Sequence, residues 1–280
     1  MKSNILVIGG TGKTGRKVVQ KLQDLQQNVR IGSRRESPAF DWQEPATWPA
    51  ALEGMEKAYV TFQPDLAVPG ALEAIEKLVD LARQSGLRKM VLLSGKGERE
   101  AELCEEVVKN SGLDYTIVRA SWFNQNFSES FFLDPILAGQ VALPQAGAEV
   151  PYVDTDDIAE VVVEVLLNET HNGHTYELTG PRTWTFPEVM QEISEATGRQ
   201  IGFSPISLPA YLQMLEQLQV PADYIWLIGY LFKEVLATEG NHLVTHDIEK
   251  VLGRKAKDFS EYVRETAATG VWTPRVAETT

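Results

Sequence analysis

Along the first 120 residues, short runs of apolar, β-forming residues alternate with segments in which apolar residues recur at helical spacing. The runs occupy residues 5–8, 28–32, 58–62, 89–93 and 115–119. Short runs of this kind are typical of strands that are buried on both faces of a parallel sheet. Helices are predicted between them, most clearly at 70–85 and 100–110. This alternation predicts an α/β fold with a doubly wound parallel sheet.

The pattern changes after residue 120. Aromatic and amide side chains crowd residues 122–132, and an apolar helix at 155–167 precedes a last strand at 175–179. Beyond residue 180 the chain is mostly helical, with helices predicted at 187–197, 209–218, 222–237 and 260–268. We therefore predict a sheet domain made of residues 1–120 and about 150–180, and a smaller, mostly helical part made of about 121–149 and 181–280.

A glycine-rich turn separates the first strand from the first helix. Its sequence is Gly9-Gly10-Thr11-Gly12-Lys13-Thr14-Gly15. Glycines permit a tight turn and let the backbone approach a pyrophosphate, whose charge is stabilised at the helix N-terminus. A glycine triplet alone is weak evidence, but the flanking strand and helix supply the context that a dinucleotide fingerprint requires. The alternative is an ordinary turn without a ligand.

The end of this turn, Gly12-Lys13-Thr14, also resembles a nucleoside-triphosphate P-loop. That motif requires a glycine where this chain has Val7, inside the predicted strand, so the P-loop is excluded. The candidate phosphate-binding residues are those of the turn: Gly9, Thr11, Gly12, Lys13, Thr14 and Gly15.

Two adjacent arginines follow the second strand, in the sequence Ser33-Arg34-Arg35. An acidic residue at this position binds the ribose 2′-hydroxyl of NAD, whereas an arginine accommodates the 2′-phosphate of NADP. Asp24 precedes the strand instead of following it. Because a guanidinium can bind a phosphate through two hydrogen bonds, the arginines favour NADP(H). A solvated pair of loop charges is the alternative.

Composition limits the classes of function. The 280 residues, of which 43% are hydrophobic and 23% charged, suit one large globular domain or one and a half. A net charge of −13 argues against nucleic acid and anionic membrane surfaces as partners. No apolar run is long enough to span a membrane or to form a signal peptide, so we expect a cytoplasmic protein. The single cysteine, Cys104, is expected to be buried.

Several parts of the sequence together resemble the NmrA-like branch of the atypical short-chain dehydrogenases/reductases. They are the glycine turn, Arg34, Ser94-Gly95-Lys96-Gly97-Glu98, residues 113–124, and residues 245–254 with Phe259. Within the branch the chain looks most similar to the ergot-alkaloid reductases, with NAD(P)H quinone reductases next. The resemblance implies a Rossmann domain, a small helical substrate domain and NADP(H) between them. The family also contains redox sensors that bind the dinucleotide without catalysing a reaction.

Short-chain dehydrogenases that reduce ketones usually use a Tyr-x-x-x-Lys pair as the proton donor. None of the eight tyrosines here is followed by a lysine four residues later. Related reductases keep a lysine at the start of the helix that Gly112 closes, which corresponds here to the neighbourhood of Ala101. Carbonyl reduction is therefore disfavoured. Quinones, iminium ions and conjugated C=C bonds remain, because they accept hydride with little help from a protein acid.

The carboxyl ends of parallel strands are where open α/β sheets bind ligands, and further candidates lie there. Phe62 is the last residue of the third strand and Gln63 follows it. Ser94 and Lys96 follow the fourth strand, and we assign all four residues to the cofactor. Lys96 is also the candidate catalytic residue, because an ammonium can stabilise a developing oxyanion. A solvated loop lysine beside Glu98 is the alternative.

The aromatic segment supplies the candidate substrate-binding residues, Trp122, Phe123, Asn124 and Asn126. They could form an aromatic floor with amide donors for a flat substrate, or they could be core between the domains. The histidine pairs 171/174 and 242/246 lack a convincing third ligand, so no metal site is predicted.

These observations predict an NADP(H)-dependent oxidoreductase of NmrA-like type that transfers hydride to a small aromatic or conjugated electrophile, such as a quinone, an iminium ion or an enone. The alternatives are a non-catalytic NADP(H) sensor that binds a regulatory protein and, less favoured, an isomerase with tightly bound cofactor. The missing Tyr–Lys pair favours the sensor, whereas the aromatic segment favours the enzyme, because a sensor needs no substrate pocket. A homodimer is left open.

Overall fold

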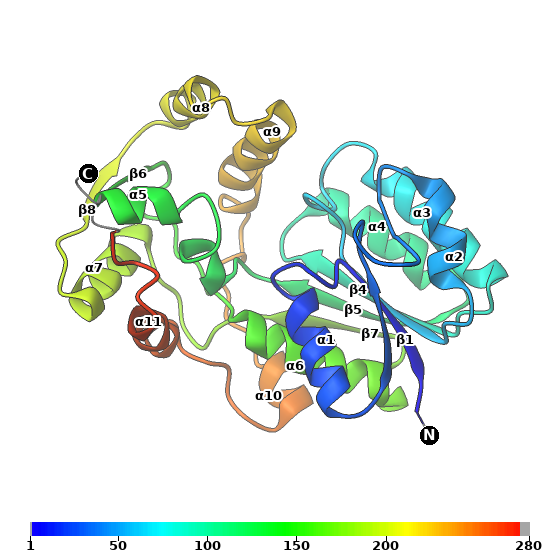
Figure 1. Ribbon diagram of the computed structural model, residues 1–280. Helices are drawn as coiled ribbons and strands as arrows, with labels where there is room; N and C mark the ends of the chain where they lie inside the picture. Colours follow the sequence, from blue (N-terminus) through cyan, green and yellow to red (C-terminus); the bar gives the residue numbers. More distant parts are fainter. Residues whose placement is uncertain (1, 275–280) are drawn as a thin grey trace, which may run out of the picture. The chain divides into compact units, whose positions relative to one another are not determined.

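The computed structural model describes residues 2–274, which divide into two compact units (Figure 1). The first unit contains residues 2–121, 155–178 and 245–255, and the second contains the remainder of the described chain. Segment 245–255 therefore belongs with the sheet, whereas the sequence groups it with the helical part. None of the described helices has the length and apolar character needed to cross a bilayer.

The first unit is built on a six-stranded sheet in which every pair of neighbours is parallel, in the order β2-β1-β3-β4-β5-β7. The strands are β1 (Asn4–Ile8), β2 (Asn28–Gly32), β3 (Lys57–Val60), β4 (Lys89–Gly95), β5 (Asp114–Ala120) and β7 (His174–Leu178). The chain moves outward from β1 to β2 and then returns to β3 on the other side of β1. The predicted doubly wound Rossmann sheet is confirmed, and the order reverses beside β1, where such folds bind ligands.

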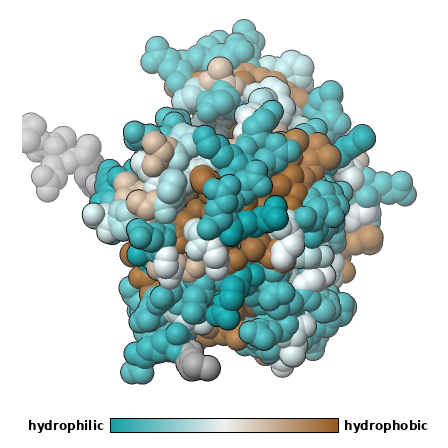
Figure 2. All heavy atoms as spheres, turned by 90° about the vertical axis from the view of Figure 1, so that its right-hand side faces the viewer, coloured by the Kyte–Doolittle hydropathy of each residue, from teal (hydrophilic) through white to brown (hydrophobic). Residues whose placement is uncertain are grey.

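Helices cover both faces of this sheet (Figure 1). On one face lie α1 (Gly15–Asp24), α6 (Thr155–Leu167) and α10 (Asp247–Leu252), and on the other α2 (Trp48–Leu52), α3 (Ala71–Gln84) and α4 (Arg99–Lys109). The second group closes a core in which the side chains of β1, β3 and β4 are buried together with Cys104, as expected for that cysteine. Hydrophilic residues predominate on the face that Figure 2 shows, with hydrophobic ones between them.

The second unit is mostly helical, as predicted. Its helices are α5 (Leu133–Ala138), α7 (Phe186–Thr197), α8 (Leu208–Gln217), α9 (Ala222–Tyr230), which continues as a π-helical turn at Leu231–Val235, and α11 (Phe259–Ala268). A two-stranded parallel sheet of β6 (Gln140–Leu143) and β8 (Gly202–Pro205) was not predicted. Aromatic rings dominate the core of this unit: Phe127, Phe132, Tyr152, Phe186, Phe232 and Phe259.

Candidate functional site

The glycine turn is sterically constrained at each glycine of its triplet. A Cβ atom on Gly9, whose φ is +75°, would lie 2.0 Å from Thr61 Oγ1, and one on Gly15 would lie 2.1 Å from the carbonyl oxygen of Gly9. At Gly12 the same oxygen would be 3.2 Å away, and the Gly12 amide donates to it at 2.8 Å. Only glycine lets the turn fold back this closely on β1 and α1, which is the geometry that a bound pyrophosphate needs.

A hydrogen bond from β3 supports the glycine turn at Thr14, and two backbone amides of the turn have no protein acceptor among the described residues. Thr14 is buried at the N-cap of α1, and the hydroxyl of Tyr59 donates a hydrogen bond to its Oγ1 at 2.9 Å. Burial raises the pKa of Tyr59, so this hydroxyl keeps its proton. Within residues 2–274 the backbone N–H groups of Thr11 and Thr14 donate to no protein acceptor. Such free amides beside a helix N-terminus are suited to an anion.

The end of β2 carries the predicted cofactor-selecting residues. Ser33 is half-buried, and its carbonyl accepts a hydrogen bond from the Phe40 amide at 3.0 Å. Arg34 and Arg35 are exposed, and neither guanidinium forms an ion pair with any described residue. Asp24 is the last residue of α1 and accepts a hydrogen bond from Gln20, so it does not lie at the end of β2.

The loop after β3 lies against the glycine turn. The side-chain nitrogen Nε2 of Gln63 is 3.9 Å from the position that a Cβ on Gly12 would occupy. Phe62 packs against Trp42 at 4.7 Å between ring centroids, and the Trp42 indole donates to the Thr61 carbonyl at 3.1 Å. Gln63 thus lies beside the turn, while Phe62 joins an aromatic cluster, and their role in cofactor binding stays a prediction.

The end of β4 carries Ser94 and Lys96, and both are buried. Ser94 donates a hydrogen bond to Glu105 Oε1 at 2.8 Å. The Lys96 residue is only 7% exposed, and its amide donates to the Ala120 carbonyl at 2.9 Å. The alternative of a solvated loop lysine is therefore wrong. Burial lowers the pKa of the Lys96 ammonium, against the opposing charge of Glu177.

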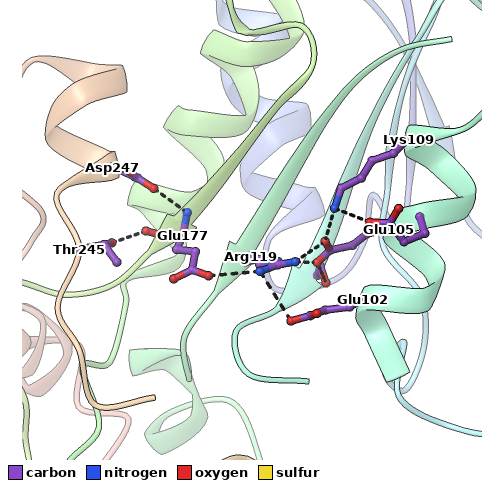
Figure 3. Close-up of polar contacts among 9 residues, drawn as sticks. Glu102, Glu105, Lys109, Arg119, Glu177, Thr245 and Asp247 are labelled. Carbon is purple, nitrogen blue, oxygen red and sulfur yellow. Dashed lines mark hydrogen bonds and ion pairs between the residues drawn. The ribbon is translucent and has the colours of Figure 1, made fainter. Parts of the chain in front are cut away.

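Sequence reasoning did not assign a role to Arg119, which organises the network behind Ser94 (Figure 3). Its Nε and Nη2 atoms each lie 2.7 Å from an oxygen of Glu105, whose side chain is fully buried. Its Nη1 lies 3.3 Å from Glu177, and Lys109 approaches Glu105 at 3.2 Å. Burial alone would raise the pKa of Glu105, but the hydrogen bonds from Arg119 and Ser94 hold it below its ordinary value. Glu105 is therefore an ionised, fully paired carboxylate.

The C-terminal signature segment attaches to the edge of the sheet beside this network (Figure 3). The Thr245 hydroxyl donates to the Glu177 carbonyl, and the Glu177 amide donates to Asp247 Oδ2 at 2.8 Å. Further along, Arg254 pairs with Asp157 of α6 at 2.7 Å. These contacts explain why residues 245–255 belong to the first unit.

The predicted substrate residues of the second unit lie on a short backbone pairing with residues 151–154. The Asn124 amide donates to the Val153 carbonyl, and the Val153 amide donates to the Trp122 carbonyl, both at 2.9 Å. Phe123 opposes Val153 in a parallel bridge. Alternate residues of paired strands point to the same side, so Trp122 and Asn124 share a side with Tyr152 and Asp154.

Three of these side chains carry buried polar atoms without a partner. Trp122 Nε1, Asn124 Oδ1 and the Tyr152 hydroxyl make no hydrogen bond to any described residue, although Asn124 Nδ2 donates to Asp154 at 3.3 Å. A buried polar group that stays unpaired costs roughly 1–3 kcal/mol, so these atoms are suited to a ligand or to water. Trp122 also packs against Phe132, Phe186 and Phe232, all within the core of this unit. Phe123 and Asn126 are half-buried.

Three of the four histidines, His171, His174 and His246, have local partners. His171 Nδ1 lies 2.8 Å from the Tyr176 hydroxyl, and His174 stacks on the same ring. His246 lies 3.8 Å from Glu249. The part of the chain that the structure describes contains no group of three or more histidine, cysteine or acidic residues arranged to hold a metal ion.

Two family models match this chain. The model of the NmrA-like family matches residues 101–266, and an NAD(P)H-binding model matches residues 9–169. Since each covers more than half of the 280 residues, the chain belongs to the NmrA-like family and carries an NAD(P)H-binding domain. The resemblance inferred from the motifs is confirmed.

Three curated relatives span nearly the whole chain. The Prestalk A differentiation protein A of Dictyostelium discoideum is 28% identical over 95% of this chain and 93% of its own length. The NAD(P)H azoreductase of Xenophilus azovorans is 28% identical over 94% and 98%. The agroclavine dehydrogenase of Claviceps fusiformis is 26% identical over 97% and 99%. Two of these three relatives are thus named as oxidoreductases.

Solved structures share the fold. The triphenylmethane reductase of Citrobacter sp., complexed with NADP(H), superposes with a TM-score of 0.73 at 20% identity, covering 94% of this chain and 99% of that one. NmrA, a negative transcriptional regulator in complex with NADP, superposes with a TM-score of 0.72 at 17% identity, covering 96% of each chain. The same fold therefore occurs in a reductase and in a regulator, so the function of this chain has to be argued from the residues of its site.

Proposed function

We propose that this protein is an NADPH-dependent reductase of small aromatic or conjugated electrophiles. The observation that carries the proposal is the glycine turn, which has no room for a Cβ at Gly9 or Gly15 and offers the free amides of Thr11 and Thr14. The amides of Thr11 and Thr14, with Lys13 between them, would hold the pyrophosphate at the N-terminus of α1. The turn therefore fits a dinucleotide.

The preference for NADPH over NADH rests on the end of β2. Arg34 and Arg35 are exposed cations without an ion pair in the described chain, next to the half-buried Ser33. Residues 33–35, which directly follow β2, include no acid, and Asp24 lies at the end of α1. A 2′-phosphate would complete the arginine pair through charge-assisted hydrogen bonds.

The chemistry requires a reduced nicotinamide, which when bound supplies an electron pair and a hydrogen to the substrate. Ser94 and Lys96 stand at the carboxyl end of β4, where this end of a dinucleotide lies in doubly wound folds. The buried Lys96 ammonium would stabilise negative charge that develops on a substrate oxygen. Trp122, Phe123, Asn124 and Asn126 would bind a flat substrate, with the unpaired Trp122 Nε1 and Asn124 Oδ1 as its polar contacts.

A dinucleotide-sensing regulator is the second candidate. It is favoured by the absence of a Tyr-x-x-x-Lys pair anywhere in the sequence. A regulator without a substrate does not explain why buried polar atoms of Trp122, Asn124 and Tyr152 have no hydrogen-bond partner, whereas a bound substrate could supply those partners. For that reason we prefer the reductase.

The test follows NADPH absorbance while the protein is offered a panel of quinones, iminium ions, enones and azo compounds. Turnover with any of them supports the reductase, whereas tight NADPH binding without turnover across the panel supports the regulator. Arg34→Asp should weaken NADPH by about 10-fold or more, as expected for a lost charged hydrogen bond. It should change NADH binding little.

Arg264→Asp, the same charge reversal on the exposed side of α11, is the matched control. Equal loss of NADPH and NADH affinity in Arg34→Asp would contradict the phosphate-binding role.

A further inference from the structure

A pair of acidic side chains lies at the carboxyl edge of the sheet, and the proposed reaction so far leaves it unused. Asp65 follows β3 by five residues, and Glu98 is the N-cap residue of α4, three residues after β4. The two carboxyl groups are close enough for a side-chain hydrogen bond between them. Glu98 is buried, with 6% of its surface exposed, whereas Asp65 is half-buried. One member of the pair thus reaches solvent and the other does not.

The main chain is shaped to receive the buried member. A Cβ atom on Gly95 would lie 2.0 Å from Glu98 Oε1 and 2.4 Å from Oε2, so the Glu98 carboxyl occupies the space over Gly95 that a side chain would fill. Oε2 of Glu98 is buried and has no hydrogen-bond partner among the described residues. Asp65 is fixed by a hydrogen bond from the Ala67 amide to its Oδ1, at 2.8 Å. Because Gly95 has no side chain, it leaves the space that the Glu98 carboxyl group occupies.

A hydrogen bond between these two groups requires a proton. Two ionised carboxylates have no donor between them, so a hydrogen bond that joins them contains a proton from one of the two. No cation forms an ion pair with either group in residues 2–274. The other titratable groups that interact with the pair are Glu100, whose charge acts on Glu98, and Cys104, on which the charge of Asp65 acts. Burial and the charge of Asp65 raise the pKa of Glu98 well above its usual range. Glu98 is the member that retains the proton.

We propose that the Asp65–Glu98 pair is the proton store of the reductase, delivering a proton through Asp65 to the reduced substrate. This inference rests on the proposed function and supplies the donor that the missing Tyr-x-x-x-Lys pair would otherwise provide. Gln63, two residues before Asp65, lies beside the glycine turn, and Lys96, two residues before Glu98, is buried at the end of β4. Each acid of the pair thus follows, by two residues, a residue that we assign to the cofactor.

The number of protons that reduction consumes distinguishes two classes of acceptor. A quinone gains one hydride, a proton together with its electron pair, from NADPH, which becomes NADP⁺, and the resulting oxyanion then takes one proton to form the hydroquinone. That proton leaves the Glu98 carboxyl, passes through Asp65, and is replaced from solvent. A cationic iminium ion gains the same hydride and becomes a neutral amine, so it needs no proton. Only quinone reduction should therefore depend on the pair.

The experiment compares Glu98→Gln and Asp65→Asn with wild type on one quinone and one quaternary iminium acceptor. We expect kcat for the quinone to fall by about 100-fold or more in both variants, the usual contribution of a general acid. The rate with the iminium ion and the KM for NADPH should stay within about threefold of wild type. A merely structural role would slow both acceptors together. Glu106→Gln and Asp80→Asn remove exposed carboxylates of α4 and α3 and serve as controls.

Infrared spectroscopy of the protein without cofactor supplies a readout that is independent of turnover. Wild type at pH 7 should show the C=O band of a protonated carboxyl group that shifts in deuterium oxide, and Glu98→Gln should lack it. Absence of this band in wild type would overturn the proton store, as would equal slowing of quinone and iminium. If quinone turnover is unchanged in both variants, this inference fails while the reductase stands. If wild type reduces no acceptor at all, the reductase proposal fails and the inference fails with it.

Discussion

Replacement of Arg119 by methionine should weaken the first unit more than a typical surface charge would. Arg119 makes two hydrogen bonds of 2.7 Å to the fully buried carboxylate of Glu105, and its own side chain is 18% exposed. Methionine preserves much of the apolar stem but removes both donors. Glu105 would then keep only the Ser94 hydroxyl at 2.8 Å and Lys109 at 3.2 Å.

The expected cost follows from the burial of the partner that remains. Removing one member of a buried ion pair typically costs 3–5 kcal/mol, because the other charge is left uncompensated. The remaining contacts of Glu105 and the partial exposure of Arg119 place this case at the lower end, about 3 kcal/mol. The double variant Arg119→Met/Glu105→Leu removes both charges and should lie within about 1 kcal/mol of wild type, because an apolar pair often replaces a buried ion pair without loss.

Hydrogen exchange measured by mass spectrometry on peptides from residues 89–120 reports the stability of β4, α4 and β5 directly. A loss of about 3 kcal/mol corresponds to roughly 150-fold faster exchange of the most protected amides. Glu106→Gln, which removes an exposed carboxylate of the same helix, is the control. The reasoning is refuted if Arg119→Met speeds exchange by less than threefold, or if the double variant exchanges as fast as the single one.

Three further outcomes follow from the geometry. Gly15→Ala should reduce NADPH affinity by about 10-fold or more in a calorimetric titration, since its Cβ would meet the Gly9 carbonyl oxygen at 2.1 Å; Gly147→Ala, with open space around it, should not. Burial raises the pKa of Glu98 in the folded state above its ordinary value of 4.5, so the free energy of unfolding should fall as the pH rises above 4.5. Glu98→Gln should remove this fall; if the variant shows the same pH dependence as wild type, the explanation is wrong. Burial and Lys57 lower the pKa of Lys89 from 10.5 to about 8, so stability in urea titrations should rise between pH 8 and 10.5, and Lys89→Met should abolish that rise.

The sheet was predictable because each of its strands carries its own signal. β1, β3 and β4 are short apolar runs, and burial on both faces of a parallel sheet demands that pattern. β6 and β8 were missed because they pair only with each other, across 62 residues of sequence, and because Gln140-Val141-Ala142-Leu143 and Gly202-Phe203-Ser204-Pro205 have little β-propensity. Their pairing depends on tertiary context that no local window contains.

The glycine turn was predictable for a related reason, since its chemistry is contained in seven consecutive residues. The hydrogen bond from Tyr59 that supports the turn could not be predicted in the same way. Tyr59 lies 45 residues from Thr14 in sequence, and as part of an apolar strand it looked like ordinary core. Segment 245–255 was misgrouped because its attachments to Glu177 and Asp157 are single side-chain contacts without periodicity.

Two glutamates near β4 show that surroundings, and not residue type, set the charge at this edge of the sheet. Glu105 and Glu98 are both buried and lie seven residues apart, but one is held ionised by Arg119 while the other has only Asp65 opposite it. Burial alone favours the neutral form of either carboxyl, and a guanidinium hydrogen-bonded at 2.7 Å is enough to reverse that preference. An ionised carboxylate fixes Ser94 and Arg119, whereas a neutral one has a proton to give. A chain without a Tyr–Lys pair can therefore carry a structural carboxylate, Glu105, and a candidate proton donor, Glu98, in one turn-and-helix segment. The position of Arg119 beside Glu105 determines which of the two glutamates is ionised.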